Sequence, residues 1–163
     1  MSLPPVPSPA IPLAALRGTI VGLDTAPLIY YIEQDATFLG LVEPFFEAFD
    51  RGDFTIVTSI VTLLEVLVGA LRKGDVAVAA RYRSILLGTP GLAVYDVDAV
   101  IAEEAARIRA GYRMRGGSNK NIKAPDAIQL ATAVLQGATY FFTGEKDLPA
   151  VGGLVIVTPR TLG

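Results

Sequence analysis

The sequence predicts an α/β fold in which a mostly parallel sheet of about five strands is covered by helices on both faces. Short apolar, β-branched segments alternate with longer segments of helical periodicity along the chain. The strand segments are apolar on both sides, as expected where both faces of a parallel sheet are buried. At 163 residues, the chain is long enough for one domain with a substantial core.

The expected strands are rich in apolar, β-branched and aromatic residues and are bounded by polar or turn-forming residues. The first, "TIVGLDT", ends in the polar pair Asp24 and Thr25, and the second, "FTIVTS", follows Asp53. Because helices separate most of these segments, neighbouring strands should run parallel. The strands are expected at residues 19–25, 54–59, 92–98, 139–145 and 154–159.

Helical periodicity or helix-favouring composition fills the segments between the strands. Gly52 closes the second expected helix, and the paired glycines Gly116 and Gly117 predict the end of the fifth. Pro125 suits the first helical position of the sixth. The helices are expected at residues 27–34, 38–53, 61–75, 75–88, 99–117 and 123–135.

The domain is expected to span residues 18–163, after a proline-rich arm at residues 1–17. The arm has no basic start and its prolines interrupt any hydrophobic segment, so it does not read as a secretory signal. Glu65 interrupts the longest apolar run, which leaves no stretch of roughly 18 apolar residues to span a membrane. We therefore expect a soluble, cytoplasmic protein that does not associate with membranes.

The composition limits the possible chemistry. The chain contains no Cys and no His, which excludes disulfides, thiolate or imidazole zinc sites, Cys nucleophiles and Ser-His-Asp arrangements. The net charge of −2 argues against indiscriminate coating of nucleic acid. The hydrophobic fraction of 52% suggests that a partner covers some apolar surface. Catalysis would have to use carboxylates, Lys, Tyr, Ser or Thr, together with a metal ion.

Acidic residues lie where such a site is expected. Asp24 closes the first strand, and Glu145 and Asp147 follow the fourth, at the carboxyl edge where open α/β sheets bind ligands. Glu65 lies in an apolar helix, where a buried charge is costly unless it is paired or bound to a metal. Asp126 begins the sixth helix. Clustered carboxylates repel one another unless cations neutralise them, and Mg²⁺ or Mn²⁺ suits oxygen ligands.

Three of these acids also have simpler interpretations. Asp126 follows Pro125, and an acid in the first turn complements the helix dipole. Asp24 could cap the following helix. Glu65 could belong to a solvent-facing stripe, although its apolar neighbours leave little room for one. The residues alone leave both interpretations open.

Four stretches together resemble a PIN domain, in particular the VapC-type toxins of toxin–antitoxin pairs. They are "IVGLDTAPLIYYIE", "TSIVTLLEVLVGAL", "KAPDAIQLATAVLQGATYFFTGEKDL" and "GGLVIVTP", which together extend over about residues 18–160. The resemblance implies a three-layer α/β/α sandwich and a metal-dependent ribonuclease that uses one or two Mg²⁺ or Mn²⁺ ions. It also implies an RNA substrate, a VapB-like antitoxin partner and a homodimer.

The metal-binding acids implied by the resemblance are Asp24, Glu65 and Asp126. The fourth would come from "TGEKD", where either Glu145 or Asp147 could serve. We favour Asp147 slightly, because Glu145 brings an extra methylene into a tight site.

Two further positions follow from the same resemblance. Thr143 matches a hydroxyl that the family often places beside the first metal. The family usually has Ser or Asn two positions after its first Asp, whereas this chain has Ala26, so one polar contact is missing. This departure leaves a second reading open, in which a degenerate PIN module binds RNA or a protein without cleavage. An aspartyl-phosphate phosphatase is disfavoured because Ala26 stands where a second Asp would be needed.

A basic stretch leads into the sixth helix. Between residues 107 and 123 the chain carries six Lys or Arg residues and no acid. Arg113, Arg115, Lys120 and Lys123 are candidates to guide a phosphate backbone toward the acids. The alternative is a solvated helix end, where cations are favoured in any case.

Overall fold

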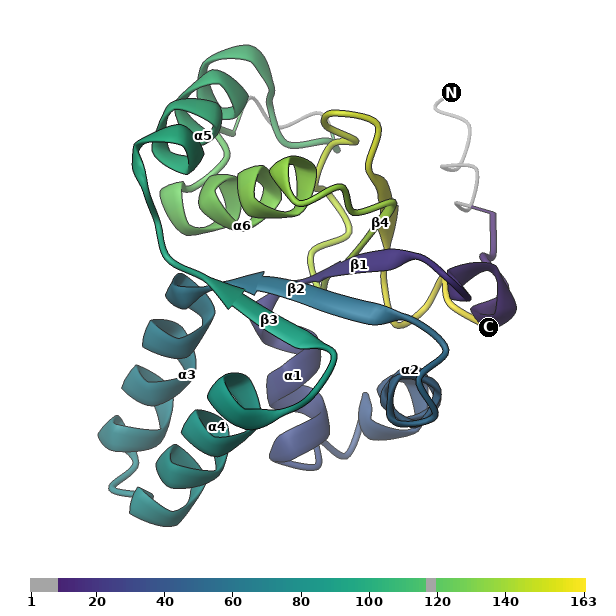
Figure 1. The fold of residues 1–163 in the computed structure, drawn as a ribbon, viewed down its shortest axis with the longest axis vertical. Coiled ribbons are helices and arrows are strands. Elements are labelled where there is room, and N and C mark those ends of the chain that lie inside the picture. Colours follow the sequence, from purple (N-terminus) through teal and green to yellow (C-terminus); the bar gives the residue numbers. More distant parts are fainter. Residues whose placement is uncertain (1–8, 117–119) are drawn as a thin grey trace.

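The computed structural model describes residues 9–116 and 120–163 and contains a five-stranded sheet between two layers of helices (Figure 1). All strand pairs are parallel, and the order across the sheet is β3-β2-β1-β4-β5. The predicted three-layer α/β/α architecture is thereby confirmed. The strands are β1 (Ile20–Leu23), β2 (Thr55–Ser59), β3 (Leu92–Tyr95), β4 (Tyr140–Phe142) and β5 (Val155–Val157).

The helices divide unequally between the two faces of the sheet (Figure 1). One hydrophobic core joins α1 to α4 to the sheet, and a second joins α5 and α6 to its other face. The helices are η1 (Leu13–Leu16, a 3₁₀ turn), α1 (Thr25–Ile32), α2 (Leu39–Asp50), α3 (Ile60–Arg72), α4 (Val76–Gly88), α5 (Ala99–Gly111) and α6 (Ala124–Leu135).

The chain order places a ligand site between β1 and β4. From β1 the connections lead through β2 to β3 on one side, and the chain then crosses by α5 and α6 to β4 on the other side of β1. Strand order therefore reverses at the β1–β4 pair. In open α/β sheets, the crevice at the carboxyl ends of two such strands is where ligands bind.

Four strands end earlier than predicted, and in β1, β3 and β4 the polar residues at the carboxyl ends take other roles. Asp24 accepts a hydrogen bond from the Thr25 amide and caps α1. Asp98 accepts one from the Ile101 amide and caps α5. Thr143 follows β4, and its side chain turns to Asp24. Two of these side chains accept hydrogen bonds from free backbone amides at helix starts, and the third bonds to the residue that follows the neighbouring strand.

The predicted extent of the fifth helix is wrong. The helix ends at Gly111, and Tyr112 is already extended, with φ −122° and ψ 155°. Arg113 pairs with Asn121 in an antiparallel bridge, so the segments on the two sides of the glycine pair run in opposite directions. The Arg109 side chain donates to the Ile122 carbonyl at 2.9 Å and holds the returning strand. Gly117 lies outside the described residues.

The described part of the N-terminal arm packs against the domain. Ile11 forms a parallel bridge with Leu162, and Leu16 in η1 is only 1% exposed. The division at residue 17 stays a prediction, and residues 1–8 lie outside the described part of the chain. Within that described part, none of the helices is both long and apolar enough to cross a membrane.

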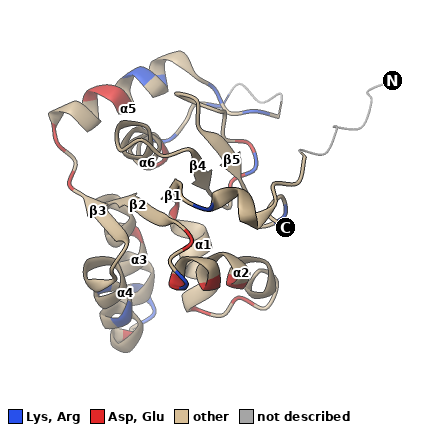
Figure 2. Cartoon of the chain, turned by 45° about the vertical axis from the view of Figure 1, so that its right-hand side comes forward, with Lys and Arg blue, Asp and Glu red and all other residues tan. Residues whose placement is uncertain are grey.

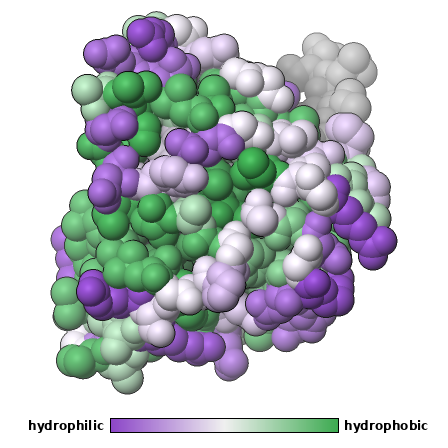
Figure 3. All heavy atoms as spheres, viewed as in Figure 1, coloured by the Kyte–Doolittle hydropathy of each residue, from purple (hydrophilic) through white to green (hydrophobic). Residues whose placement is uncertain are grey.

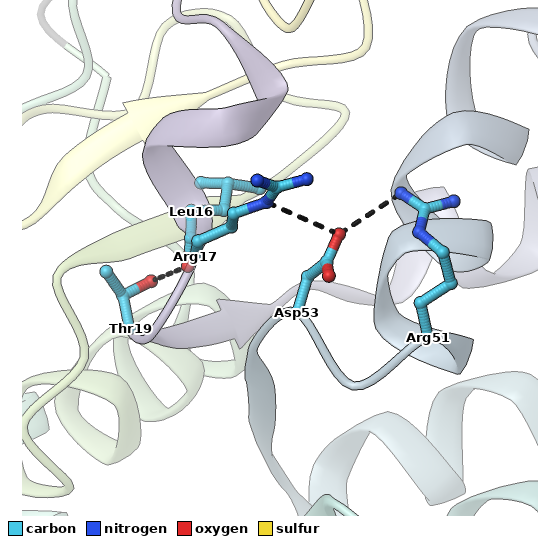
Figure 4. A network of polar contacts seen from close by, with 5 residues as sticks. All are labelled: Leu16, Arg17, Thr19, Arg51 and Asp53. Atoms are coloured by element: carbon cyan, nitrogen blue, oxygen red, sulfur yellow. Dashed lines mark hydrogen bonds and ion pairs between the residues drawn. The ribbon is translucent and has the colours of Figure 1, made fainter.

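Charged residues avoid the strands, which are uncharged along their whole length (Figure 2). At the amino edge of the sheet, Asp53 is paired by two arginines (Figure 4). The Asp53 carboxylate lies 3.1 Å from Arg51 Nη2 and 3.9 Å from Arg17 Nε. This acid is therefore neutralised by its neighbours.

Helix α6 approaches β1 closely at Gly22. A Cβ added to Gly22 would lie 2.7 Å from the Ala133 Cβ and 2.7 Å from Phe141 Cδ2, closer than side-chain carbons approach. The absence of a side chain at this strand position thus lets α6 lie against the sheet.

We expect Gly22→Ala to destabilise the protein by about 1–3 kcal/mol, because the added methyl must displace α6 or Phe141. Urea unfolding would measure the difference. Gly69→Ala is the matched control, since Gly69 lies inside α3 with nothing within 4 Å of its added Cβ. That change should stabilise the helix by roughly 0.5–1 kcal/mol. Equal effects at the two positions would contradict the packing argument.

Candidate active site

Asp24 lies at the centre of the carboxyl edge, directly after β1, and is 8% exposed. Its Oδ1 accepts a hydrogen bond from the Thr25 amide at 2.7 Å, and its Oδ2 accepts one from Thr143 Oγ1 at 2.7 Å. Burial raises the pKa of Asp24 above its ordinary value of 3.8, while these two hydrogen bonds oppose the rise. The negative charges of Glu65 and Glu145 add to it.

The segment after β4 reaches the same place through Thr143. The Thr143 hydroxyl donates to Asp24 and accepts from the Glu145 amide at 2.9 Å. Gly144 packs on α1, where an added Cβ would lie 2.9 Å from the Ala26 Cβ and 3.2 Å from the Tyr30 hydroxyl. Ala26, the departure noted in the sequence, is therefore in contact with the loop that carries Glu145.

Asp126 enters from the first turn of α6 and is half-buried. Desolvation, followed by the charges of Asp24 and Glu65, raises the pKa of Asp126 to about 6. Lys123 opposes this rise, and Glu145 adds to it. A carboxyl group with such a pKa is not explained by a solvated helix cap, because its environment disfavours the charge.

The four acids Asp24, Glu65, Asp126 and Glu145 thus act on one another at a single edge of the sheet. Among the described residues, no Lys or Arg nitrogen lies within 4.0 Å of any of them. Over the same residues, no three acidic side chains lie close enough to hold an ion as they stand. The acids converge, but they do not form a preassembled chelate, as expected of like charges that repel one another.

Asp147 lies apart from this group. Its backbone amide donates to Glu145 Oε1 at 3.0 Å, and its carbonyl accepts from the Arg115 amide at 2.7 Å. Its carboxylate lies against Gly116, where an added Cβ would come within 3.2 Å of Oδ1. The charge of Glu145 is among the causes that raise the pKa values of Asp24 and Asp126, whereas that of Asp147 is not among them.

The four basic candidates are not equivalent. Lys123 precedes α6, and its charge lowers the pKa of Asp126. Arg113 donates to the carbonyls of Arg109 and Tyr112 on its own segment. Arg115 lines a pocket beside β5, and Lys120 is exposed. Lys123 is therefore the candidate whose charge acts on the acids.

Sequence reasoning missed a buried hydrogen-bond network behind the acids. Thr25 Oγ1 donates to Glu65 Oε1 at 2.9 Å, and Gln129 Nε2 donates to Thr25 Oγ1 at 2.9 Å and to Thr62 Oγ1 at 2.8 Å. The signal was present, because Gln129 lies one turn after Asp126 in an otherwise apolar segment. Its polar side chain at a core position required a partner.

The fold and the site define a class: an α/β protein with converging carboxylates at the switch point of a parallel sheet. The chain belongs to the PIN domain family, because the family model for the PIN domain matches residues 21–154. No curated protein sequence matches the chain.

Solved structures with the same fold include toxins of toxin–antitoxin pairs. A toxin–antitoxin complex from Klebsiella pneumoniae has a chain 26% identical, with a TM-score of 0.61 and coverage of 87% of this chain and 98% of that chain. VapBC2 from Rickettsia felis, bound to a promoter DNA fragment, gives 17% identity, a TM-score of 0.63 and coverage of 85% and 98%. VapC20 from Mycobacterium tuberculosis, a sarcin–ricin loop cleaving toxin, is 17% identical, with a TM-score of 0.59 and coverage of 76% of this chain and 87% of that chain. At 17% identity, the last two establish the fold alone.

The raised pKa of Asp126 predicts a pH-dependent stability. Because the folded state binds this proton more tightly than the unfolded state does, the free energy of unfolding falls as pH rises from about 4 through about 6. We expect Asp126→Asn to stabilise the metal-free protein at pH 7 by about 1 kcal/mol, a value discounted for partial exposure, and to have little effect near pH 4.

Urea unfolding in a chelator at the two pH values would measure this difference. Glu103→Gln, on the exposed surface of α5, controls for the general loss of one negative charge. Destabilisation of Asp126→Asn at pH 7 would show that the ionised carboxylate supports the metal-free fold, contrary to this prediction.

Proposed function

We propose that this protein is a divalent-metal-dependent endoribonuclease and the toxin of a VapBC-type toxin–antitoxin pair. The observation that carries the proposal is the convergence of Asp24, Glu65, Asp126 and Glu145, none of which has a Lys or Arg nitrogen within 4.0 Å among the described residues. Burial first, and then the neighbouring acids, raise the pKa values of Asp24 and Asp126, so binding of a cation would favour their charged forms. Family membership supports the same chemistry.

The donor set fits Mg²⁺ or Mn²⁺, because carboxylate oxygens are the ligands that these hard cations prefer. Asp24, Glu65 and Asp126 would hold one or two ions, with Glu145 as the fourth acid. Bound there, a divalent ion supplies charge stabilisation for a phosphodiester and acidifies water. Thr143 orients Asp24 through its hydroxyl, and at pH 7 most of Asp126 is ionised and able to bind.

The RNA backbone would be received at the start of α6. The amino end of this helix carries a partial positive charge, and Lys123 adds a full charge beside Asp126. The adjoining basic segment contains Arg113, Arg115 and Lys120, which would contact the RNA backbone farther from the acids. Substrate affinity should therefore depend on ionic strength.

An antitoxin partner is part of the proposal. The Klebsiella pneumoniae structure is a toxin–antitoxin complex, and its chain matches this one over most of both lengths. The face seen in Figure 1 exposes a broad hydrophobic area (Figure 3). Large apolar side chains remain exposed on α3 and α4, among them Leu64, Leu71 and Val76 at 61%, 61% and 72%. Such surface suits a protein partner or the expected homodimer.

A PIN module that binds without cleavage is the second candidate. The observation in its favour is that no three acids in the described chain are placed to hold an ion as they stand. It predicts no specific binding of a divalent ion at Asp126, which separates the two functions experimentally.

We expect Asp126→Asn to weaken Mn²⁺ binding at least about tenfold, or 1.4 kcal/mol, because it removes one ionised ligand. Calorimetry at pH 7.5, above the raised pKa of Asp126, would measure it, with Glu103→Gln as the surface control. Cleavage of a total cellular RNA pool in Mn²⁺ should be abolished by the same change. Equal binding and equal cutting by wild type and variant would place the site elsewhere, whereas absence of binding in both would favour the non-catalytic module.

The identity of the fourth acid can be tested with a matched pair. We expect Glu145→Gln to weaken Mn²⁺ binding at least about threefold and Asp147→Asn by less than about twofold. The reason is that Glu145 acts on the Asp24 and Asp126 carboxylates, whereas Asp147 lies against Gly116. The opposite order would assign the role to Asp147.

A further inference from the structure

Gln129 occupies an unusual position for an amide. It lies on α6, three residues after Asp126, and is only 2% exposed. Its neighbours Ala127 and Leu130 are fully buried. A buried amide without partners is costly, and the contacts of Gln129 satisfy its nitrogen, whereas its buried Oε1 has no partner among the described residues.

The direction of one branch of the network can be derived from its end. The Leu23 carbonyl can only accept, so Thr58 Oγ1 donates to it at 2.8 Å. The Thr58 oxygen then accepts from Thr62 Oγ1 at 2.8 Å, since its single hydrogen is already used. The Thr62 oxygen in turn accepts from Gln129 Nε2 at 2.8 Å. The branch runs in one direction, from the Gln129 amide to the first strand.

The second branch ends at Glu65. Gln129 Nε2 donates to Thr25 Oγ1 at 2.9 Å, and the Thr25 hydroxyl donates to Glu65 Oε1 at 2.9 Å. Gln129 Nε2 also lies 3.2 Å from the same Glu65 oxygen. Exchange of the amide nitrogen and oxygen would bring Gln129 Oε1 against this carboxylate, so the observed orientation is favoured. Glu65 is thus held through Oε1, and Oε2 has no hydrogen-bond donor among the described residues.

We propose that Gln129 and Thr25 are positioning residues that fix the Glu65 carboxylate and direct its Oε2 into the site. Thr25 acts on two acids at once, because its amide also holds Asp24 Oδ1 at 2.7 Å. Gln129 joins the helix that carries Asp126 to the helix that carries Glu65. The value of this arrangement for metal binding rests on the proposed function, whereas the arrangement itself does not.

The first test is Mn²⁺ calorimetry on variants that remove the hydrogen bonds of one side chain with little change in its shape. Thr25→Val removes the hydroxyl but keeps the amide on Asp24, and Gln129→Met removes both donors. Each should weaken Mn²⁺ binding about tenfold. Thr25→Ser retains the hydroxyl and should restore binding to within about twofold of wild type.

Thr132→Val is the matched control for loss of a buried hydroxyl. Thr132 is 0% exposed on the same helix, and its hydroxyl donates to the Ile128 carbonyl within that helix. The Thr132→Val variant should bind Mn²⁺ with the affinity of the wild type. Wild-type affinity in Thr25→Val and Gln129→Met would overturn the proposal, as would an equal loss in Thr132→Val.

A second measurement does not depend on metal. In the metal-free protein, the side-chain amide protons of Gln129 should exchange with water more slowly in NMR spectra than those of exposed Gln34. Their resonances should shift in Glu65→Ala and in Thr25→Val. Rapid exchange, or no shift in either variant, would overturn the positioning proposal. If these signals behave as expected while wild type binds no Mn²⁺, the positioning of Glu65 stands and the proposed nuclease function fails.

Discussion

The structure depends on the burial of one carboxylate, Asp24, beside other acids and without a cation among its described neighbours. Two short hydrogen bonds, from the Thr25 amide and the Thr143 hydroxyl, reduce the cost of this burial but do not remove it. At the opposite edge of the same sheet, Asp53 is paired with arginines. The contrast is informative, because a fold selected for stability alone would pair or remove the buried acid. A charge kept unpaired at a ligand-binding edge is typical of a functional site.

The fold brings the acids together through one close contact and one reversal of strand order. Asp24 and Thr143 are neighbours because β4 pairs with β1. Asp126, about a hundred residues along the chain from Asp24, reaches the same edge because α6 lies directly on Gly22. The hydrogen bonds of Gln129 then connect α6 to α3, so the two helices that carry Asp126 and Glu65 are aligned by buried contacts.

The sequence predicted what local patterns determine. Apolar β-branched segments identified the strands, and Pro125 identified the start of α6. It placed the end of α5 six residues too late, because the pairing of Arg113 with Asn121 is a tertiary contact that no local signal reports. For the same reason it offered the acids as candidates without indicating their hydrogen-bond partners. Gln129 and Thr25 contact Glu65 only after three separate helices have packed. The proposal of Glu145 over Asp147 likewise rests on the path of the loop, which no local pattern reports.

The departure at Ala26 has a structural counterpart. Gly144 packs so closely on Ala26 that a methyl group added at position 144 would be crowded. A longer polar side chain at position 26 would meet the same loop. Because Ala26 and Gly144 are both small, this loop can lie against α1. In this position the Thr143 hydroxyl donates a hydrogen bond to Asp24 and accepts one from the Glu145 amide. The small side chain at position 26 thus accommodates the loop that carries Glu145. Because the hydrogen bonds to Asp24 remain intact, the substitution changes how the site is enclosed and leaves its central carboxylate in place.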